Sequence, residues 1–170
     1  MWFGELQKAS GRMKHDYYHA QECTPQLQQV AKELIAKIHA VAPGLDILFM
    51  GAAALGLPGK NDIDLDILCD QFDIERYAEV LTPVLGTPQE LKTNMAVWSH
   101  MRDSVEIDCI LSDPKAPNSH IPKQKKVFET LKADPELQER YRQLKLDCDG
   151  LPYEQYEAKK KAFLEEVADL

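Results

Sequence analysis

The stretch that decides the fold is GLPGKNDIDLDIL, residues 56–68, in which a glycine-containing spacer leads into a strictly alternating segment. Successive side chains of a β-strand point to opposite faces of the sheet, so this alternation predicts a strand with its acidic residues on one face. These residues are Asp62, Asp64 and Asp66, and the residues between them are aliphatic. Aspartate is depleted in strands, and like charges spaced two apart repel one another. The acidic face therefore either lines a solvated sheet edge or binds a cation.

Two neighbouring segments favour the cation. Residues 51–57, GAAALGL, follow the short apolar segment 47–50 and are expected to form a turn of small residues that lets backbone N–H groups approach a phosphate closely. A later alternating segment, 105–111, carries Glu106 and Asp108 on one face. If the two alternating segments pair, Asp108 joins the aspartates of the first. Carboxylates that hold a divalent ion, with one that accepts a proton, are suited to phosphoryl or nucleotidyl transfer.

The remaining pattern predicts an α+β fold. A helix is expected from Pro25, with Thr24 as its N-cap, and another from Asp73 that ends before Pro83. Strands are expected at 47–50, 62–68, 91–101 and 104–111, with a hairpin at Arg102-Asp103 between the last two. Helices fill the chain from residue 123 onward, with breaks at 149–152 and at 134–135, where Asp134 is expected to cap the next helix. Residues 1–23 have no clear period and are expected to form an accessory segment, followed by a single domain at 24–170.

Composition limits the possible partners. The chain has 170 residues and a net charge of −8, which fits one domain and makes nucleic acid an unlikely partner. No apolar segment is long enough for a membrane span and no secretory leader is evident, so we expect a cytoplasmic protein without membrane contact. The four cysteines are scattered, which argues against a disulfide framework or a zinc ribbon. His15, His19 and Cys23 would share a helix face, a spacing that we interpret as coincidental.

Gly51-Ala52, a spacer, the Asp-hydrophobic-Asp strand and a later strand with one aspartate resemble the layout of polymerase-β-type nucleotidyltransferases. GLPGKNDIDLDIL is more closely similar to the signature of GrpB-like proteins. Two further segments, VFETLKADPELQERYRQLKL (127–146) and YEQYEAKKKAFLEEV (153–167), resemble the helical blocks that close a GrpB-like domain. The resemblance covers residues 47–170 in three separated blocks.

The resemblance implies a small mixed sheet of the nucleotidyltransferase type, flanked by helices and followed by a helical tail. It also implies transfer of a nucleoside monophosphate from a nucleoside triphosphate to a small-molecule or protein acceptor, with Mg²⁺ or Mn²⁺ as cofactor. The implied metal-binding and catalytic residues are Asp64, Asp66 and Asp108, and the implied nucleotide-binding residues are Gly51, Ala52 and Lys60. One lysine of 159–161 is expected to face the site.

Two alternatives follow from departures in the sequence. Ala52 stands where the family has a serine, so a phosphate-binding hydroxyl is missing. A catalytically degenerate protein that binds a ligand or regulates a partner is therefore the second functional hypothesis. The metal pair is Asp62 and Asp64 in the other alternative, because that spacing also fits the wider superfamily.

Overall fold

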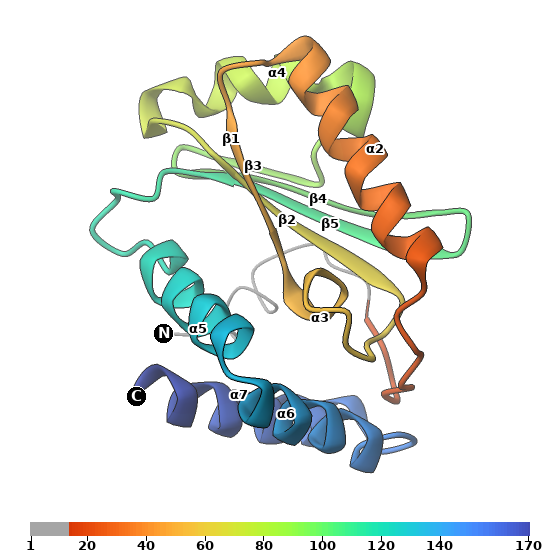
Figure 1. The fold of residues 1–170 in the computed structure, drawn as a ribbon. Coiled ribbons are helices and arrows are strands. Elements are labelled where there is room, and N and C mark those ends of the chain that lie inside the picture. The colour runs from red at the N-terminus through yellow and green to blue at the C-terminus, as the bar shows by residue number, and fades with distance from the viewer. Residues whose placement is uncertain (1–13) are drawn as a thin grey trace.

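The computed structural model describes residues 14–170, and its centre is a mixed five-stranded sheet (Figure 1). Trp2 and Phe3 of the predicted accessory segment lie outside the described residues. The strand order is β1-β2-β5-β4-β3. The strands are β1 (Asp46–Met50), β2 (Asp62–Leu68), β3 (Glu90–Lys92), β4 (Met95–Arg102) and β5 (Val105–Ser112). Only β2 and β5 pair in parallel among these strands, and their register places Asp64 beside Asp108.

One face of the sheet is covered by α2 (Pro25–Val41) and α4 (Ile74–Leu85), as Figure 1 shows. The aliphatic residues of β2 and the odd-numbered residues of β5 point to this face and form the main core with the two helices. Thr24 accepts a hydrogen bond from the backbone of Leu27, so the predicted N-cap of α2 is confirmed. Because these side chains bury one face, the alternate residues of both strands are directed to the other.

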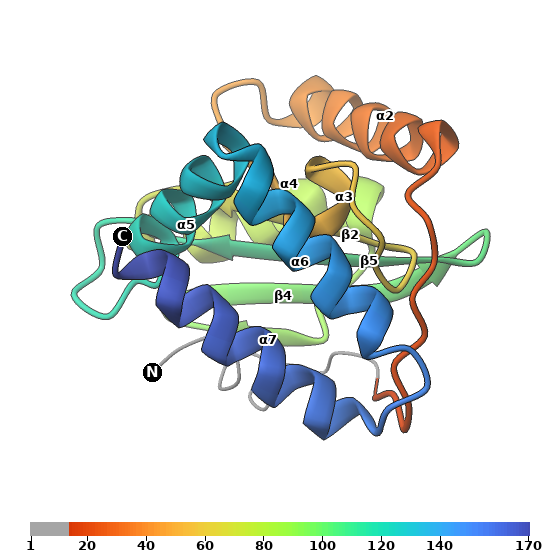
Figure 2. The same cartoon turned by 60° about the horizontal axis from the view of Figure 1, so that its bottom comes forward.

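The opposite face looks toward the helical tail, which consists of α5 (Ile121–Ala133), α6 (Pro135–Asp147) and α7 (Tyr153–Ala168) (Figure 2). These helices share a separate apolar cluster, which also includes Ala52 and Leu57. Asp134 accepts hydrogen bonds from the first backbone N–H groups of α6, as its predicted capping role requires. The predicted fold class is confirmed: a small mixed sheet flanked by helices, with a C-terminal helical tail. No helix within residues 14–170 is long and apolar enough to cross a membrane.

Three local predictions were wrong. The strand expected at 91–101 is interrupted at residues 93–94 and forms the separate strands β3 and β4, which pair with each other. Helix α4 continues through Pro83 to Leu85, because a proline so near the end removes a single helical hydrogen bond. The small-residue segment after β1 begins with a one-turn helix, α3 (Gly51–Ala54), since its three alanines favour helix over turn.

The hairpin expected between β4 and β5 is present. Its turn residues Asp103 and Ser104 both have positive φ, 49° and 66°, as a type I′ turn requires. Aspartate tolerates this conformation better than most residues, so the turn forms without glycine. The hairpin aligns β5 so that it can pair with β2 on its other edge.

Candidate active site

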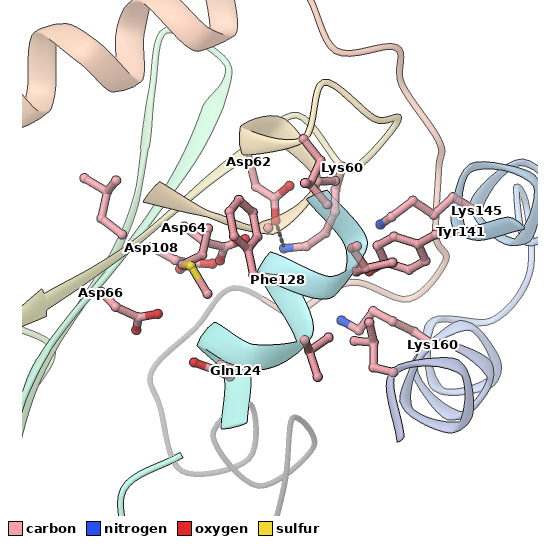
Figure 3. Close-up of a pocket in the computed structure, with 18 of the residues that line it drawn as sticks. Lys60, Asp62, Asp64, Asp66, Asp108, Gln124, Phe128, Tyr141, Lys145 and Lys160 are labelled. Carbon is pink, nitrogen blue, oxygen red and sulfur yellow. Dashed lines mark ion pairs between the residues drawn. The ribbon is translucent and has the colours of Figure 1, made fainter. Parts of the chain in front are cut away.

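The polar face of the sheet and the helical tail enclose a pocket with two unlike walls (Figure 3). The first wall is acidic and comes from β2 and β5. The second carries lysine and tyrosine side chains from α6 and α7. The acidic wall contains Asp62, Asp64, Asp66 and Asp108, and the facing wall contains Tyr141, Lys145, Tyr156 and Lys160. A phosphate-bearing ligand with a bound cation would be neutralised from both sides in such a pocket.

Three of the carboxylates converge. Asp62, Asp64 and Asp108 each offer an oxygen atom within 4.8 Å of the other two. Their proximity follows from the parallel register of β2 and β5, which sets Asp64 beside Asp108, and from the two-residue period that puts Asp62 on the same face. Oxygen donors in this number leave coordination positions for substrate oxygens, as Mg²⁺ and Mn²⁺ sites require. The donor set therefore fits a divalent cation.

Asp66 lies in the same pocket but outside that convergent group. It is only 8% exposed, and its register partner on β5 is Ile110 rather than an acid. The structure thus brings together Asp64 and Asp108 of the predicted site with Asp62, the residue of the alternative metal pair.

Gly51 is the first residue of α3 and lines the pocket next to the acidic wall. Its φ is +75°, which favours glycine, and a Cβ built there would collide with the carboxylate of Asp64. The glycine is therefore required by the close approach of the Asp64 side chain. Ala52 lines the pocket beside it and packs against the apolar cluster of the tail, so the position predicted to bind nucleotide presents a methyl group.

Lys60 points into the acidic wall. Its Nζ lies 3.0 Å from Asp62 and 3.4 Å from Glu106. Burial alone would lower the pKa of Lys60, but the charges of Asp62 and Glu106 outweigh it and hold the pKa above its usual value. Burial likewise acts to raise the pKa of Asp62, and Lys60 reverses the effect, so the pKa of Asp62 is lowered. Both groups are charged at neutral pH.

Glu106 is a residue of the site to which sequence reasoning assigned no role. It is 2% exposed, and its Oε2 lies 2.8 Å from Nε2 of His15. Its place on the same strand face as Asp108 was the signal available in the sequence. His15 belongs to a non-helical segment, residues 14–23, so the zinc-compatible helix spacing of its histidines and Cys23 does not form.

The same segment packs against the domain. Tyr18 is 1% exposed and stacks on Tyr156, with ring centroids 3.6 Å apart. Gln21 exchanges backbone hydrogen bonds of 2.7 and 2.9 Å with Gly59, directly before Lys60. Residues 14–23 therefore contact Tyr156 of the facing wall and the residue that precedes Lys60.

Lys145 was also missed, although Leu137, Tyr141 and Lys145 recur every four residues as the buried face of α6. It is 3% exposed and donates a hydrogen bond of 2.9 Å to the hydroxyl of Tyr156. Burial, and then the nearby charge of Lys160, lowers the pKa of Lys145 to about 8. Among the described residues no carboxylate forms an ion pair with it, so its charge is available to a ligand.

Lys160 is the lysine of 159–161 that faces the pocket, as predicted. Its Nζ lies 2.6 Å from Glu157 of the same helix, which holds the side chain against the pocket wall. The two lysines of this wall thus differ, since one is paired with a carboxylate and the other with a tyrosine hydroxyl.

Comparison with known proteins shows the fold class. No family model matches the chain. A UPF0157 protein of Vibrio cholerae is 24% identical over 152 residues, which cover 89% of this chain and 80% of that protein. Cid1 poly(U) polymerase with bound MgGTP superposes with a TM-score of 0.52 at 15% identity, over 72% of this chain and 41% of Cid1. A second Cid1 structure, studied for its RNA terminal uridylyl transferase activity, gives 0.50 at 16% identity, over 69% and 40%.

The chain therefore spans about two fifths of the length of these Cid1 structures. At such identities the likeness establishes a fold shared with Cid1. The chemistry of the pocket is determined by the residues that line it.

Proposed function

We propose that this protein is a metal-dependent nucleotidyltransferase of the GrpB-like kind, which transfers a nucleoside monophosphate from a nucleoside triphosphate to an acceptor. The observation that carries the proposal is the convergence of Asp62, Asp64 and Asp108 from two parallel strands, opposite two lysines in one pocket. The nucleotidyltransferase fold supports it. The chain's net charge of −8 favours a small-molecule or protein acceptor over RNA.

Each residue has a role that its position allows. Asp62, Asp64 and Asp108 would hold Mg²⁺ or Mn²⁺, which polarises the phosphoryl group and aligns it for attack when bound. Asp108 would also accept the proton of the acceptor's hydroxyl or amine group, whose oxygen or nitrogen forms the new bond to the α-phosphorus as pyrophosphate leaves. Lys145 and Lys160 would neutralise phosphate oxygens from the facing wall.

Binding of Mn²⁺ and nucleoside triphosphates tests the proposal through thermal stability. At a ligand concentration one hundred times the Kd, we expect stabilisation of about 2.7 kcal/mol, or a Tm increase of about 5–10 °C for a chain of this size. Asp64→Asn and Asp108→Asn should abolish the increase, whereas Asp66→Asn, outside the convergent group, should retain most of it. Pyrophosphate release is then measured over a panel of acceptors. Wild-type protein whose Tm neither metal nor nucleotide changes would contradict the proposal.

A catalytically degenerate binding or regulatory protein is the second candidate, and Ala52 favours it. The side chain at this position lines the pocket yet offers no hydroxyl to a phosphate. Ala52→Ser restores the hydroxyl. A protein that binds nucleotide without releasing pyrophosphate, in both the wild type and Ala52→Ser, is the result that would favour this second function.

A further inference from the structure

We propose that Glu106 is a positioning residue that holds Lys60 away from Asp62 when a divalent cation binds. The proposal rests on the metal site of the proposed function and concerns how that site is opened. Lys60 lies between two carboxylates, at 3.0 Å from Asp62 and 3.4 Å from Glu106. Only Asp62 of these two belongs to the convergent group among the described residues.

Asp62 and Glu106 compete for the ammonium group of Lys60 because the strand register places them side by side. Asp62 of β2 and Glu106 of β5 are direct neighbours in the parallel pair, and their side chains share the polar face. Lys60 precedes this point by two residues and is 16% exposed, so its charge cannot move far into solvent. A cation that binds Asp62 must displace the lysine from that carboxylate, because an ammonium group and a metal ion beside one oxygen repel each other.

Glu106 offers the displaced lysine a second partner. Its side chain is 3% exposed, and its two oxygens are used separately: Oε1 faces Lys60, while Oε2 lies 2.8 Å from His15. The histidine fixes the orientation of the carboxylate, and the other oxygen remains directed at the lysine. Without this partner the buried ammonium group would keep its ion pair with Asp62, since a buried charge left unpaired is costly.

Residues 14–23 help to position Glu106 and the backbone next to Lys60. His15 reaches Glu106 across 91 positions of sequence, and the same segment is tied to Gly59 beside Lys60. Glu106 itself stays out of the metal set, so its effect on the cation is exerted through Lys60.

A double-mutant cycle on Mn²⁺ affinity tests this, with free Mn²⁺ measured by electron paramagnetic resonance. Glu106→Gln should weaken Mn²⁺ binding about tenfold, the lower end of the effect of losing an outer-shell partner. Lys60→Met should bind Mn²⁺ at least as tightly as the wild type. In the Lys60→Met background Glu106→Gln should change the affinity by less than about twofold, because no lysine remains to be held. Lys60→Gln repeats the cycle with a side chain that can still donate a hydrogen bond, should Lys60→Met fold poorly.

The control is Glu157→Gln, which removes a carboxylate paired with the pocket lysine Lys160. It should leave Mn²⁺ affinity within about twofold, since it does not contact Lys60. A tenfold effect of Glu106→Gln that persists without Lys60 would show that Glu106 is merely a nearby negative charge, and would overturn this inference alone. Wild-type protein that binds no Mn²⁺ would overturn both this inference and the proposed function.

Discussion

Replacing Gly51 by alanine should have two separate effects. It should lower the free energy of unfolding through the backbone, and it should weaken Mn²⁺ binding at the proposed metal site. The residue has φ of +75°, and an added Cβ would collide with the Asp64 carboxylate. A non-glycine residue in such a conformation costs about 1–3 kcal/mol. With about 2 kcal/mol as the central value, the Tm of a chain of this size should fall by about 4–8 °C.

The second effect is on the position of the Asp64 carboxylate and so on Mn²⁺ affinity. The colliding atom is the end of the Asp64 side chain, which has to rotate away from the position where it converges with Asp62 and Asp108. We therefore expect Gly51→Ala to weaken Mn²⁺ binding by at least about tenfold, the smallest loss usual even for outer-shell changes at metal sites. Calorimetric titration with Mn²⁺ below the Tm of the variant measures this loss.

Gly86→Ala is the matched control. Gly86 is the C-cap that follows α4; its φ is +80°, and a Cβ there would have nothing within 4 Å. This variant should lose a similar amount of stability, about 1–3 kcal/mol, and keep its Mn²⁺ affinity. If Gly51→Ala binds Mn²⁺ as tightly as Gly86→Ala does, Asp64 does not need its observed position, and the reasoning from the close approach is refuted.

Burial lowers the pKa of Lys145 from 10.5 to about 8, so between these values the unfolded chain binds more protons than the folded one, and stability should rise with pH. From pH 7 to pH 9.5 the free energy of unfolding should increase by about 2 kcal/mol, as measured by urea titration. Lys145→Met should remove this increase, and an increase that is unchanged in the variant would contradict the lowered pKa of Lys145. Tyr18→Ala should cost about 3 kcal/mol because the ring is 1% exposed and stacked on Tyr156. Tyr17→Ala, at a 58% exposed position, should cost less than about 0.5 kcal/mol, and equal losses would refute the packing argument.

Features that depend on neighbours in sequence were predicted well. The alternation of residues 62–68 specified β2 and its acidic face, since side-chain direction in a strand has a period of two. Thr24 and Asp134 specified the starts of α2 and α6, because an N-cap bonds to backbone groups two or three residues away. The break at residues 93–94 was missed, since no glycine or proline marks it.

The composition of the site was decided by contacts between distant segments. The sequence by itself determined that β2 presents acids to one face, and it left open whether Asp62 or Asp66 joins Asp64. The parallel register with β5 brings Asp108 to Asp64 and leaves Asp66 beside Ile110. Such pairing is set by side-chain packing across the whole sheet, so no local pattern reveals it.

The roles of Lys145 and Glu106 also depend on contacts between segments that are distant in sequence. Lys145 looks like any other lysine of a polar helix until α6 packs against Tyr18 and Tyr156 and buries its amine. Glu106 acquires its role only when residues 14–23 bring His15 to it. The sequence determined which residues could carry a charge on the acidic face of β2, and only the tertiary structure decided which charges meet, because electrostatic coupling depends on distance and burial rather than on separation along the chain.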